Sequence, residues 1–143
     1  MRPIYLLDTN IISELRKPVA NQKVMEKFAR YAEISVISAI AFDEMLFGVK
    51  RMGEGRKKEA LMEFYTDFIQ KSLDIIPFDV HCAWVHSDIT ERLEKLGRPS
   101  PLIDSMIAAT AIANNQILVT RNVNDFEVIQ SVSNLMIENW FEE

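Results

Sequence analysis

Short apolar runs alternate with helical repeats along the chain. The run PIYLLD is rich in strand formers and ends at DTN, whose side-chain oxygens are suited to cap a following helix. EISVISAI, LDIIPF, ILVT and LMIEN predict four more short strands, and Pro77 places LDIIPF at a sheet edge because proline cannot donate to a ladder. Helical spacing of apolar residues separates these runs, as in NQKVMEKFARY and FDEMLFGVKRM.

Three longer helical repeats have expected core faces and ends. One repeat is expected to end at Gly97, and the next to begin with Ser100 as N-cap and Pro101 in the first turn. The expected core faces are Leu61, Phe64, Tyr65, Phe68 and Ile69 in the first repeat, Val85, Ile89, Leu93 and Leu96 in the second, and Ile103, Ile107 and Ala111 in the third.

Alternating strands and helices predict an α/β fold, with a mainly parallel central sheet of about five strands. Helices on both faces of that sheet would make a three-layer α/β/α sandwich. No break in composition divides the 143 residues, so we expect one domain, residues 1–143.

Charge and cysteine content narrow the class of protein. The 16 Lys and Arg against 21 Asp and Glu give a net charge of −5, which argues against the broad basic surface of a duplex-DNA binder. Local basic residues in KRMGEGRKK, residues 50–58, leave RNA contacts or an ordinary solvated face open. The single Cys82 cannot form an internal disulfide and is expected to be a small apolar helix residue. The N-terminus lacks the apolar stretch of a signal peptide or membrane span, so we expect a cytoplasmic protein.

Four acidic residues are expected at one rim of the sheet. Asp8 follows the first strand, Glu44 lies six residues beyond the second, and Asp125 comes five residues after Thr120, where the fourth strand ends. Asp104 falls in the first turn of a helix, whose N-terminus favours a carboxylate. Because ligands of such sheets bind outside the carboxyl ends of the strands, these acids have a structural reason to converge.

Converging carboxylates need protons or a cation. Two unit charges ~4 Å apart repel by about 4 kcal/mol at an effective dielectric constant near 20. A set of oxygen ligands without His or Cys suits a hard divalent ion such as Mg²⁺ or Mn²⁺. Such an ion lowers the pKa of bound water and stabilises charge on a phosphate under attack.

Each acid taken alone also has an ordinary structural interpretation. Asp8 and Asn10 suit a helix cap, Glu44 a solvated helix surface, Asp104 a helix dipole and Asp125 an Asx-turn. The common rim is what favours the metal site over these four separate roles.

Other catalytic classes fit the sequence less well. A haloacid dehalogenase-type phosphatase needs a second acid two residues after Asp8, where this chain has Asn10. A nucleotide-binding domain would need a glycine-rich loop, and the sequence has neither G-x-G-x-x-G nor G-K-S/T. Zinc hydrolysis is disfavoured because His81 and His86 are five residues apart on a helix and face different ways.

Four segments in order, LLDTNIISE, ISAIAFDEMLFGV, PLIDSMIAATA and LVTRNVNDF, resemble the PIN-domain ribonucleases. Within them the closest resemblance is to the VapC-like toxins of bacterial type II toxin–antitoxin pairs, and it extends from Ile4 to about Trp140. It implies an endoribonuclease dependent on Mg²⁺, with Mn²⁺ as a substitute. The metal ligands would be Asp8 and Asp104, with Glu44 and Asp125 completing the acidic quartet directly or through waters. The catalytic set would also include Thr120 and Asn122, which match polar positions of the family that orient the attacking water or the acids, and Asn10 would hold Asp8 or the local turn.

The same resemblance implies partners. It suggests a homodimer, an RNA substrate such as a transfer RNA or another structured RNA, and a cognate VapB-like antitoxin that inserts a segment into the acidic groove. With the antitoxin, an assembly such as a hetero-octamer would form, and DNA would be bound only through the antitoxin. Met and Phe side chains in EMLFGVKRM and LMEFYTDF are candidates for the antitoxin groove or for ordinary core. Two rival interpretations stay open: a non-catalytic PIN-like module that binds RNA, and cleavage of structured DNA as in flap-type relatives.

Overall fold

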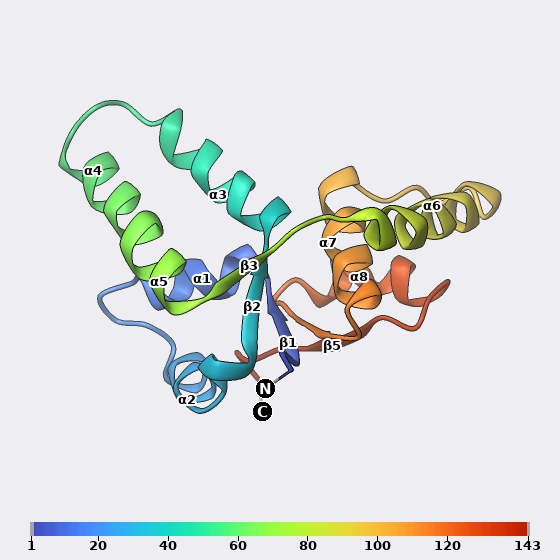
Figure 1. Cartoon of the computed structure of the whole chain (residues 1–143), viewed down its shortest axis with the longest axis horizontal. Coiled ribbons are helices and arrows are strands. Elements are labelled where there is room, and N and C mark those ends of the chain that lie inside the picture. The colour runs from blue at the N-terminus through green and yellow to red at the C-terminus, as the bar shows by residue number, and fades with distance from the viewer. Residues whose placement is uncertain (1, 143) are drawn as a thin grey trace.

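A five-stranded parallel sheet forms the middle layer of the computed structural model, which describes residues 2–142 (Figure 1). The strand order is β3-β2-β1-β4-β5, and each neighbouring pair runs parallel. The strands are β1 (Tyr5–Leu7), β2 (Ser35–Ser38), β3 (Asp74–Ile76), β4 (Ile117–Val119) and β5 (Met136–Glu138). The expected strands are confirmed, and β3 is an edge strand as Pro77 predicts.

Helices cover both faces of the sheet, so the predicted three-layer α/β/α sandwich is confirmed (Figure 1). On one side lie α1 (Thr9–Leu15), α2 (Gln22–Tyr31), the 3-10 turn η1 (Ala32–Ile34), α3 (Ala39–Lys50), α4 (Arg56–Glu63), the π-helical segment η2 (Phe64–Ile69) and α5 (Gln70–Ser72). On the other lie α6 (Val80–Lys95), α7 (Leu102–Ala113) and α8 (Val123–Gln130). Within residues 2–142, no helix has the length and apolarity that crossing a membrane requires.

The sheet reverses its winding between β1 and β4. The chain leaves β1 for β2 through α1 and α2 on one face, and it leaves β4 for β5 through α8 on the other (Figure 1). Such a switch point opens a crevice at the carboxyl ends of the two strands. The first residues after β1 and β4 are Asp8 and Thr120, and the Asp8 main-chain N–H donates to the Val119 carbonyl at 2.9 Å.

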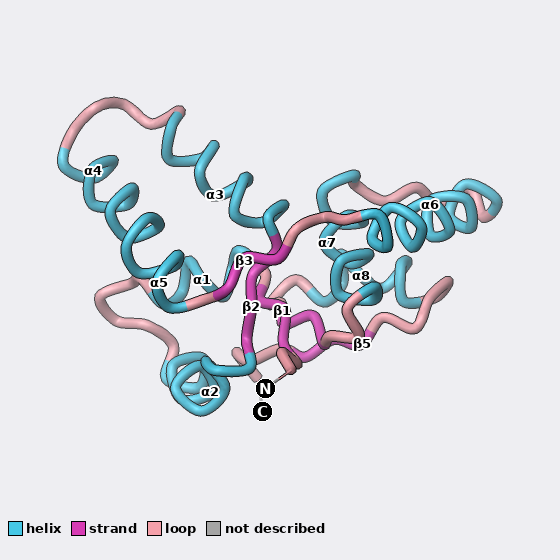
Figure 2. Tube along the Cα trace, in the orientation of Figure 1, coloured by secondary structure: helices cyan, strands magenta, loops and turns pink. Residues whose placement is uncertain are grey.

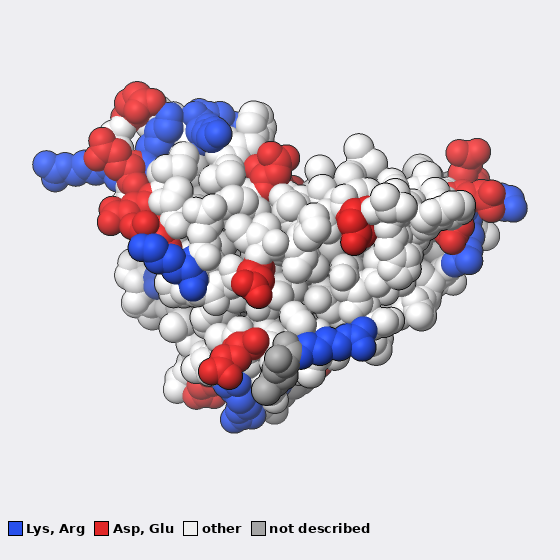
Figure 3. Space-filling model, in the orientation of Figure 1, with Lys and Arg blue, Asp and Glu red and all other residues white. Residues whose placement is uncertain are grey.

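The α3 and α4 helices form an arm that projects beyond the sheet, with the loop of residues 51–55 at its tip (Figure 2). Basic and acidic side chains gather at this tip, and the surface is hollowed between the arm and the α6–α7 side, where an acidic side chain is visible (Figure 3). Exposed cations of the tip are Lys50, Arg51, Arg56 and Lys57. The basic segment noted in the sequence therefore stands at one wall of the hollow.

Some expected core and cap positions are wrong. Leu96 is 55% exposed because α6 ends at Lys95 and Leu96 is its C-cap, while Gly97 takes the expected positive φ of 64°. The N-cap of α7 is Pro101, whose extended ψ of 141° occupies the cap position, so Ser100 does not cap this helix.

The first helical repeat also departs from its expected face. Tyr65 and Ile69 are buried as expected, but Phe68 is 37% exposed and stacks on Phe64 with ring centroids 5.0 Å apart. The wider π-helical turn of η2 changes the angular spacing along this stretch, so the regular 3.6-residue period no longer predicts its core face.

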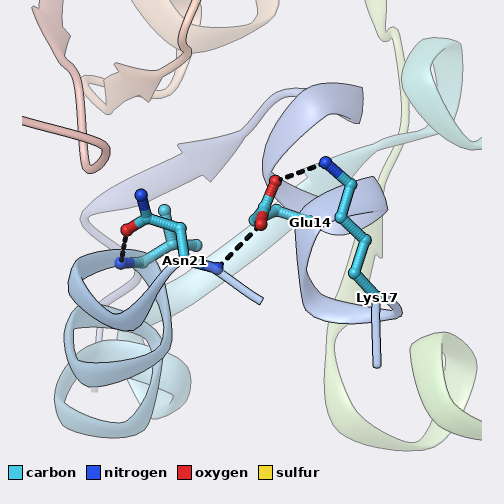
Figure 4. A network of polar contacts seen from close by, with 4 residues as sticks. Glu14, Lys17 and Asn21 are labelled. Atoms are coloured by element: carbon cyan, nitrogen blue, oxygen red, sulfur yellow. Dashed lines mark hydrogen bonds and ion pairs between the residues drawn. The ribbon is translucent and has the colours of Figure 1, made fainter. Parts of the chain in front are cut away.

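A buried carboxylate joins α1 to the start of α2 (Figure 4). Glu14 accepts the main-chain N–H of Asn21 at 2.7 Å and the ammonium group of Lys17 at 2.9 Å. Asn21 in turn caps α2, because its Oδ1 accepts the Val24 N–H at 3.1 Å. The hydrogen bonds from Lys17 and Asn21 lower the pKa of Glu14.

We expect Glu14→Gln to lower the free energy of unfolding at pH 7 by about 1 kcal/mol, because the amide loses the charge-assisted bond to Lys17. Because the pKa of Glu14 is lower in the folded protein, its carboxylate stabilises the fold at pH values above the unfolded-state pKa of about 4.3. This stabilisation is lost as the pH falls through the folded-state pKa. Urea unfolding at several pH values measures the difference, which should shrink in acid. The exposed Glu63→Gln is the matched control, and equal losses from both substitutions would contradict the role of Glu14.

Candidate metal centre at the carboxyl ends of β1 and β4

Asp8 is a buried carboxylate whose two oxygens are both held. It is the N-cap of α1 and is 6% exposed. Its Oδ1 accepts the Thr9 N–H at 2.8 Å, and its Oδ2 accepts the Thr120 hydroxyl at 2.9 Å. Burial raises the pKa of Asp8, the hydrogen bonds oppose that rise, and the charge of Asp125 adds to it. One carboxylate therefore both caps a helix and lies at the switch point.

The hydroxyl of Thr120 has only one direction in which to donate. It accepts the side-chain N–H of Asn10 at 3.1 Å and the main-chain N–H of Asn122 at 3.0 Å. With both lone pairs engaged, its proton points to Asp8. Asn10 also donates to Asp8 Oδ2 at 3.3 Å, and its Oδ1 accepts the Arg121 main-chain N–H at 3.0 Å. These contacts fit the orienting roles predicted for Thr120 and Asn10.

Glu44 and Asp104 approach Asp8 from opposite faces of the sheet. Glu44 is an exposed residue of α3, a helix that Ser38 caps by accepting the Ala41 N–H at 3.0 Å. Desolvation raises the pKa of the Glu44 carboxyl group, and the charges of Asp8 and Asp104 raise it further. Asp104 is half-buried in the first turn of α7. Desolvation again raises its pKa, followed by the charge of Asp8.

Asp125 completes the set from the first turn of α8, where it is exposed. Its charge helps to raise the pKa of both Asp8 and Asp104. All four predicted acids thus interact electrostatically at one rim. Asn122 differs from the prediction in one respect: the contact that joins it to Thr120 is made by its main-chain N–H, and its side chain is exposed beside Asp125.

The donor set fits a hard divalent ion that keeps part of its water shell. The acids offer only oxygens, and their mutual repulsion favours a cation. Among residues 2–142, no group of three or more His, Cys, Asp or Glu side chains is arranged to hold a metal together. Mg²⁺ is commonly bound through one or two carboxylates and several waters, so this spacing is compatible with it.

Two cavities flank the acids. One, of about 460 Å³, lies between α1, α3 and α4 and is lined by Glu44, Arg16 and Lys57 together with apolar residues. The other, of about 470 Å³, lies between the start of α8 and the segment after β5, and includes Asp125 and Asn139. The sequence analysis offered EMLFGVKRM and LMEFYTDF, which line the first cavity, as candidates for a groove or for core, and it missed the second cavity. Asn139 directly follows β5, so the rule that placed Asp8 at the rim would have found it.

The remaining histidine and cysteine positions agree with the exclusion of other chemistry. Cys82 is fully buried in α6, as expected of a small apolar helix residue. His86 lies within hydrogen-bonding distance of the Ser105 hydroxyl, at 2.9 Å, and its burial lowers the pKa of the imidazole. Neither contributes to the acidic site.

Comparison with known proteins identifies a family for this chain. The PIN domain family model matches residues 5–130. The ribonuclease VapC2 of Rickettsia felis is 33% identical over 139 residues, covering 96% of this chain and 98% of the relative. The toxin FitB of Neisseria gonorrhoeae is 32% identical over 124 residues, covering 85% and 89%.

A solved structure extends the likeness to three dimensions. The structure of VapBC2 from Rickettsia felis bound to a DNA fragment from their promoter contains a chain that matches with a TM-score of 0.79 and 31% identity. The match covers 96% of this chain and 98% of that one. With the acids at the switch point and the family model matching most of the sequence, the chain belongs to the PIN domain family and, within it, to the VapC ribonucleases.

Proposed function

We propose that this protein is the toxin of a type II toxin–antitoxin pair and that it cleaves RNA with a divalent metal ion, Mg²⁺ or Mn²⁺, held at Asp8, Glu44, Asp104 and Asp125. The observation that carries the proposal is the mutual electrostatic coupling of carboxylates from separate elements. Desolvation and neighbouring negative charge raise the pKa of Asp8, Glu44 and Asp104 together. A folded chain keeps such a costly cluster when a bound cation offsets the repulsion.

In this proposal Asp8 and Asp104 would bind the ion, and Glu44 and Asp125 would complete the acidic quartet directly or through waters. When bound, the ion supplies an activated water and stabilises charge on the phosphate. Thr120 and Asn10 orient Asp8 by donating to Oδ2, and these bonds favour its ionised form against the effect of burial. Glu44 is suited to take a proton from the attacking water, because its raised pKa brings it closer to neutral pH than an ordinary carboxyl group.

The substrate path follows the cavity beside Glu44. Arg16 and Lys57 line this cavity from α1 and α4, so two cations flank one carboxylate. The rest of the chain is net acidic, and these cations offer local phosphate contacts beside the acids. We assign this groove to the backbone of a structured RNA such as a transfer RNA.

The antitoxin would occupy the same groove. The VapBC2 complex bound to promoter DNA supports a cognate antitoxin for this chain. We propose further that the toxin is a homodimer and that larger assemblies with the antitoxin reach DNA through the antitoxin. Apolar side chains accompany the cations in the groove. Met52 and Leu61 are partly exposed there, while Met45, Val49 and Tyr65 line it from the core. An amphipathic antitoxin segment carrying an Arg or Lys would cover Met52 and Leu61 and neutralise the acids.

The first prediction concerns cleavage. We expect purified protein to cut total bacterial RNA into discrete fragments with Mg²⁺ or Mn²⁺ and not with EDTA. Asp104→Asn removes a proposed direct ligand of the metal. Its loss of activity should exceed the loss of about 10–100-fold that is typical when a residue supporting a metal ligand is changed. Asp88→Asn, an exposed carboxylate of α6, is the matched control. Absence of cleavage by antitoxin-free protein under all conditions would favour a non-catalytic RNA-binding module.

The second prediction concerns metal and stability. Mn²⁺ at millimolar concentration should raise the melting temperature of the wild type and leave that of Asp8→Asn nearly unchanged. Without metal, Asp104→Asn should melt above the wild type at pH 7, because one repelling charge is gone.

The pH dependence of that gain has a definite sign. A carboxyl group with a raised folded pKa binds more protons when folded, so its unfavourable effect grows as the pH rises from about 4 through the folded value. The difference between Asp104→Asn and wild type should therefore disappear in acid. A difference that persists unchanged at low pH would refute electrostatic coupling as its cause.

The third prediction concerns Thr120. Thr120→Val keeps the shape of the side chain and removes the only proton that it donates to Asp8. We expect weaker Mn²⁺ binding and cleavage reduced about 10–100-fold, with Thr120→Ser restoring both. Isothermal titration with Mn²⁺ separates this role from simple packing, because a packing defect would leave the affinity of the folded protein for metal unchanged.

A further inference from the structure

The cavity between α8 and the chain end has no role in the mechanism apart from Asp125. Its walls come from two segments that follow neighbouring strands, residues 121–125 after β4 and residues 139–142 after β5. At about 470 Å³ it falls within the range of small-molecule sites, about 300–1,000 Å³. It therefore has room for part of a nucleotide beside the acids.

The lining favours an uncharged polar ligand. Three carboxamides, Asn122, Asn124 and Asn139, face this cavity, and each carries both a donor and an acceptor. One guanidinium group stands against two carboxylates, Asp125 and Glu142, so a free phosphate is disfavoured here. The groove lined by Arg16 and Lys57 has the opposite balance of charge, because it has two cations and one carboxylate.

A flat surface adjoins the carboxamides. The guanidinium carbon of Arg121 lies 4.5 Å from the ring centroid of Phe141, and the Phe141 main-chain N–H donates to Asn139 Oδ1 at 3.0 Å. The latter bond fixes the Asn139 amide and leaves its NH₂ group to donate elsewhere. Guanidinium planes and aromatic rings are the surfaces on which unpaired RNA bases stack, and carboxamides pair with base edges.

Hydrogen bonds hold this cavity at a fixed position relative to Asp8. The Arg121 main-chain N–H donates to Asn10, and the Asn122 main-chain N–H donates to Thr120. Asn10 and Thr120 both donate to Asp8 Oδ2. The cavity wall is thus one side chain away from Asp8, the carboxylate that would hold the metal. A base bound in this cavity would therefore lie close to a phosphate held at the metal.

We propose that this cavity binds the nucleobase adjacent to the scissile phosphate and sets the base preference of cleavage at that position. Glu142 and the amide oxygens of Asn122 and Asn124 can accept from exocyclic amino groups, which adenine, cytosine and guanine carry and uracil lacks, so the site should disfavour uracil. The inference rests on the proposed ribonuclease function, because it assumes that RNA crosses the acids.

The test is cleavage of a pool of short single-stranded RNAs randomised in sequence, with sequencing of the cut ends. The wild type should disfavour uracil at one position flanking the cut. Asn124→Ala should reduce this discrimination about tenfold, the scale of one lost base-edge contact, without changing preferences elsewhere. Arg121→Ala removes a stacking surface and should weaken cleavage with every base at that position. Arg30→Ala is the matched control, since Arg30 also lies over an aromatic ring, Tyr31, at 5.9 Å but on α2, away from the acids.

A measurement of oligonucleotide binding distinguishes failure of this proposal from failure of the ribonuclease assignment. Fluorescent adenine, cytosine and uracil oligonucleotides are titrated into Asp104→Asn protein, alone and combined with Asn124→Ala, so that no cleavage is needed. Weaker uracil binding that depends on Asn124 supports the pocket even if the wild type cuts nothing. A base preference that Asn124→Ala leaves unchanged, or equal binding of all three oligonucleotides, would overturn the proposal.

Discussion

The site depends on one buried carboxylate held between β1 and β4. Burial removes water from the Asp8 carboxylate, and two hydrogen-bond donors of the protein take its place. They are the main-chain N–H of Thr9, which follows β1, and the hydroxyl of Thr120, which follows β4. Because the two strands pair in parallel, with Leu7 beside Val119, their next residues are brought together. The register of this central pair therefore fixes the position of Asp8, and a shift of one residue would separate it from its hydroxyl donor.

The other acids impose a conflict between stability and function. Glu44 comes from α3 on one face of the sheet, and Asp104 and Asp125 come from α7 and α8 on the other. The charges of Asp104 and Asp125 each raise the pKa of a neighbouring acid, and the pKa of Glu44 is itself raised by burial and by the charges of Asp8 and Asp104. The surrounding fold has to oppose this repulsion through buried apolar contacts such as those of Ile11 and Leu118. A cation that relieves the repulsion would bind to a site whose geometry the fold already maintains.

Local pattern was sufficient for the five strands and for the rim that they share, since each strand falls within a run that predicts it and parallel strands share their carboxyl edge. It did not predict α8, whose first turn carries Asp125. It was not sufficient where backbone geometry changes the period, as in η2, where Phe68 turns outward. Long-range partners were also beyond it. The bond from Arg121 to Asn10 joins residues 111 apart, so it depends on strand order rather than on any neighbouring residue.

The different linings of the two cavities would fix the orientation of an RNA strand at the proposed site. Arg16 and Lys57 make the α1–α4 side attractive to phosphates, while the carboxamides and the mixed charges of Arg121, Asp125 and Glu142 suit a neutral base. An RNA strand crossing the acids would then place its backbone toward the arm and one base toward α8. On this arrangement an antitoxin segment that covers the apolar and cationic groove displaces the backbone without entering the base cavity. Inhibition and base preference would therefore reside on opposite sides of Asp8, and each could change without loss of the other.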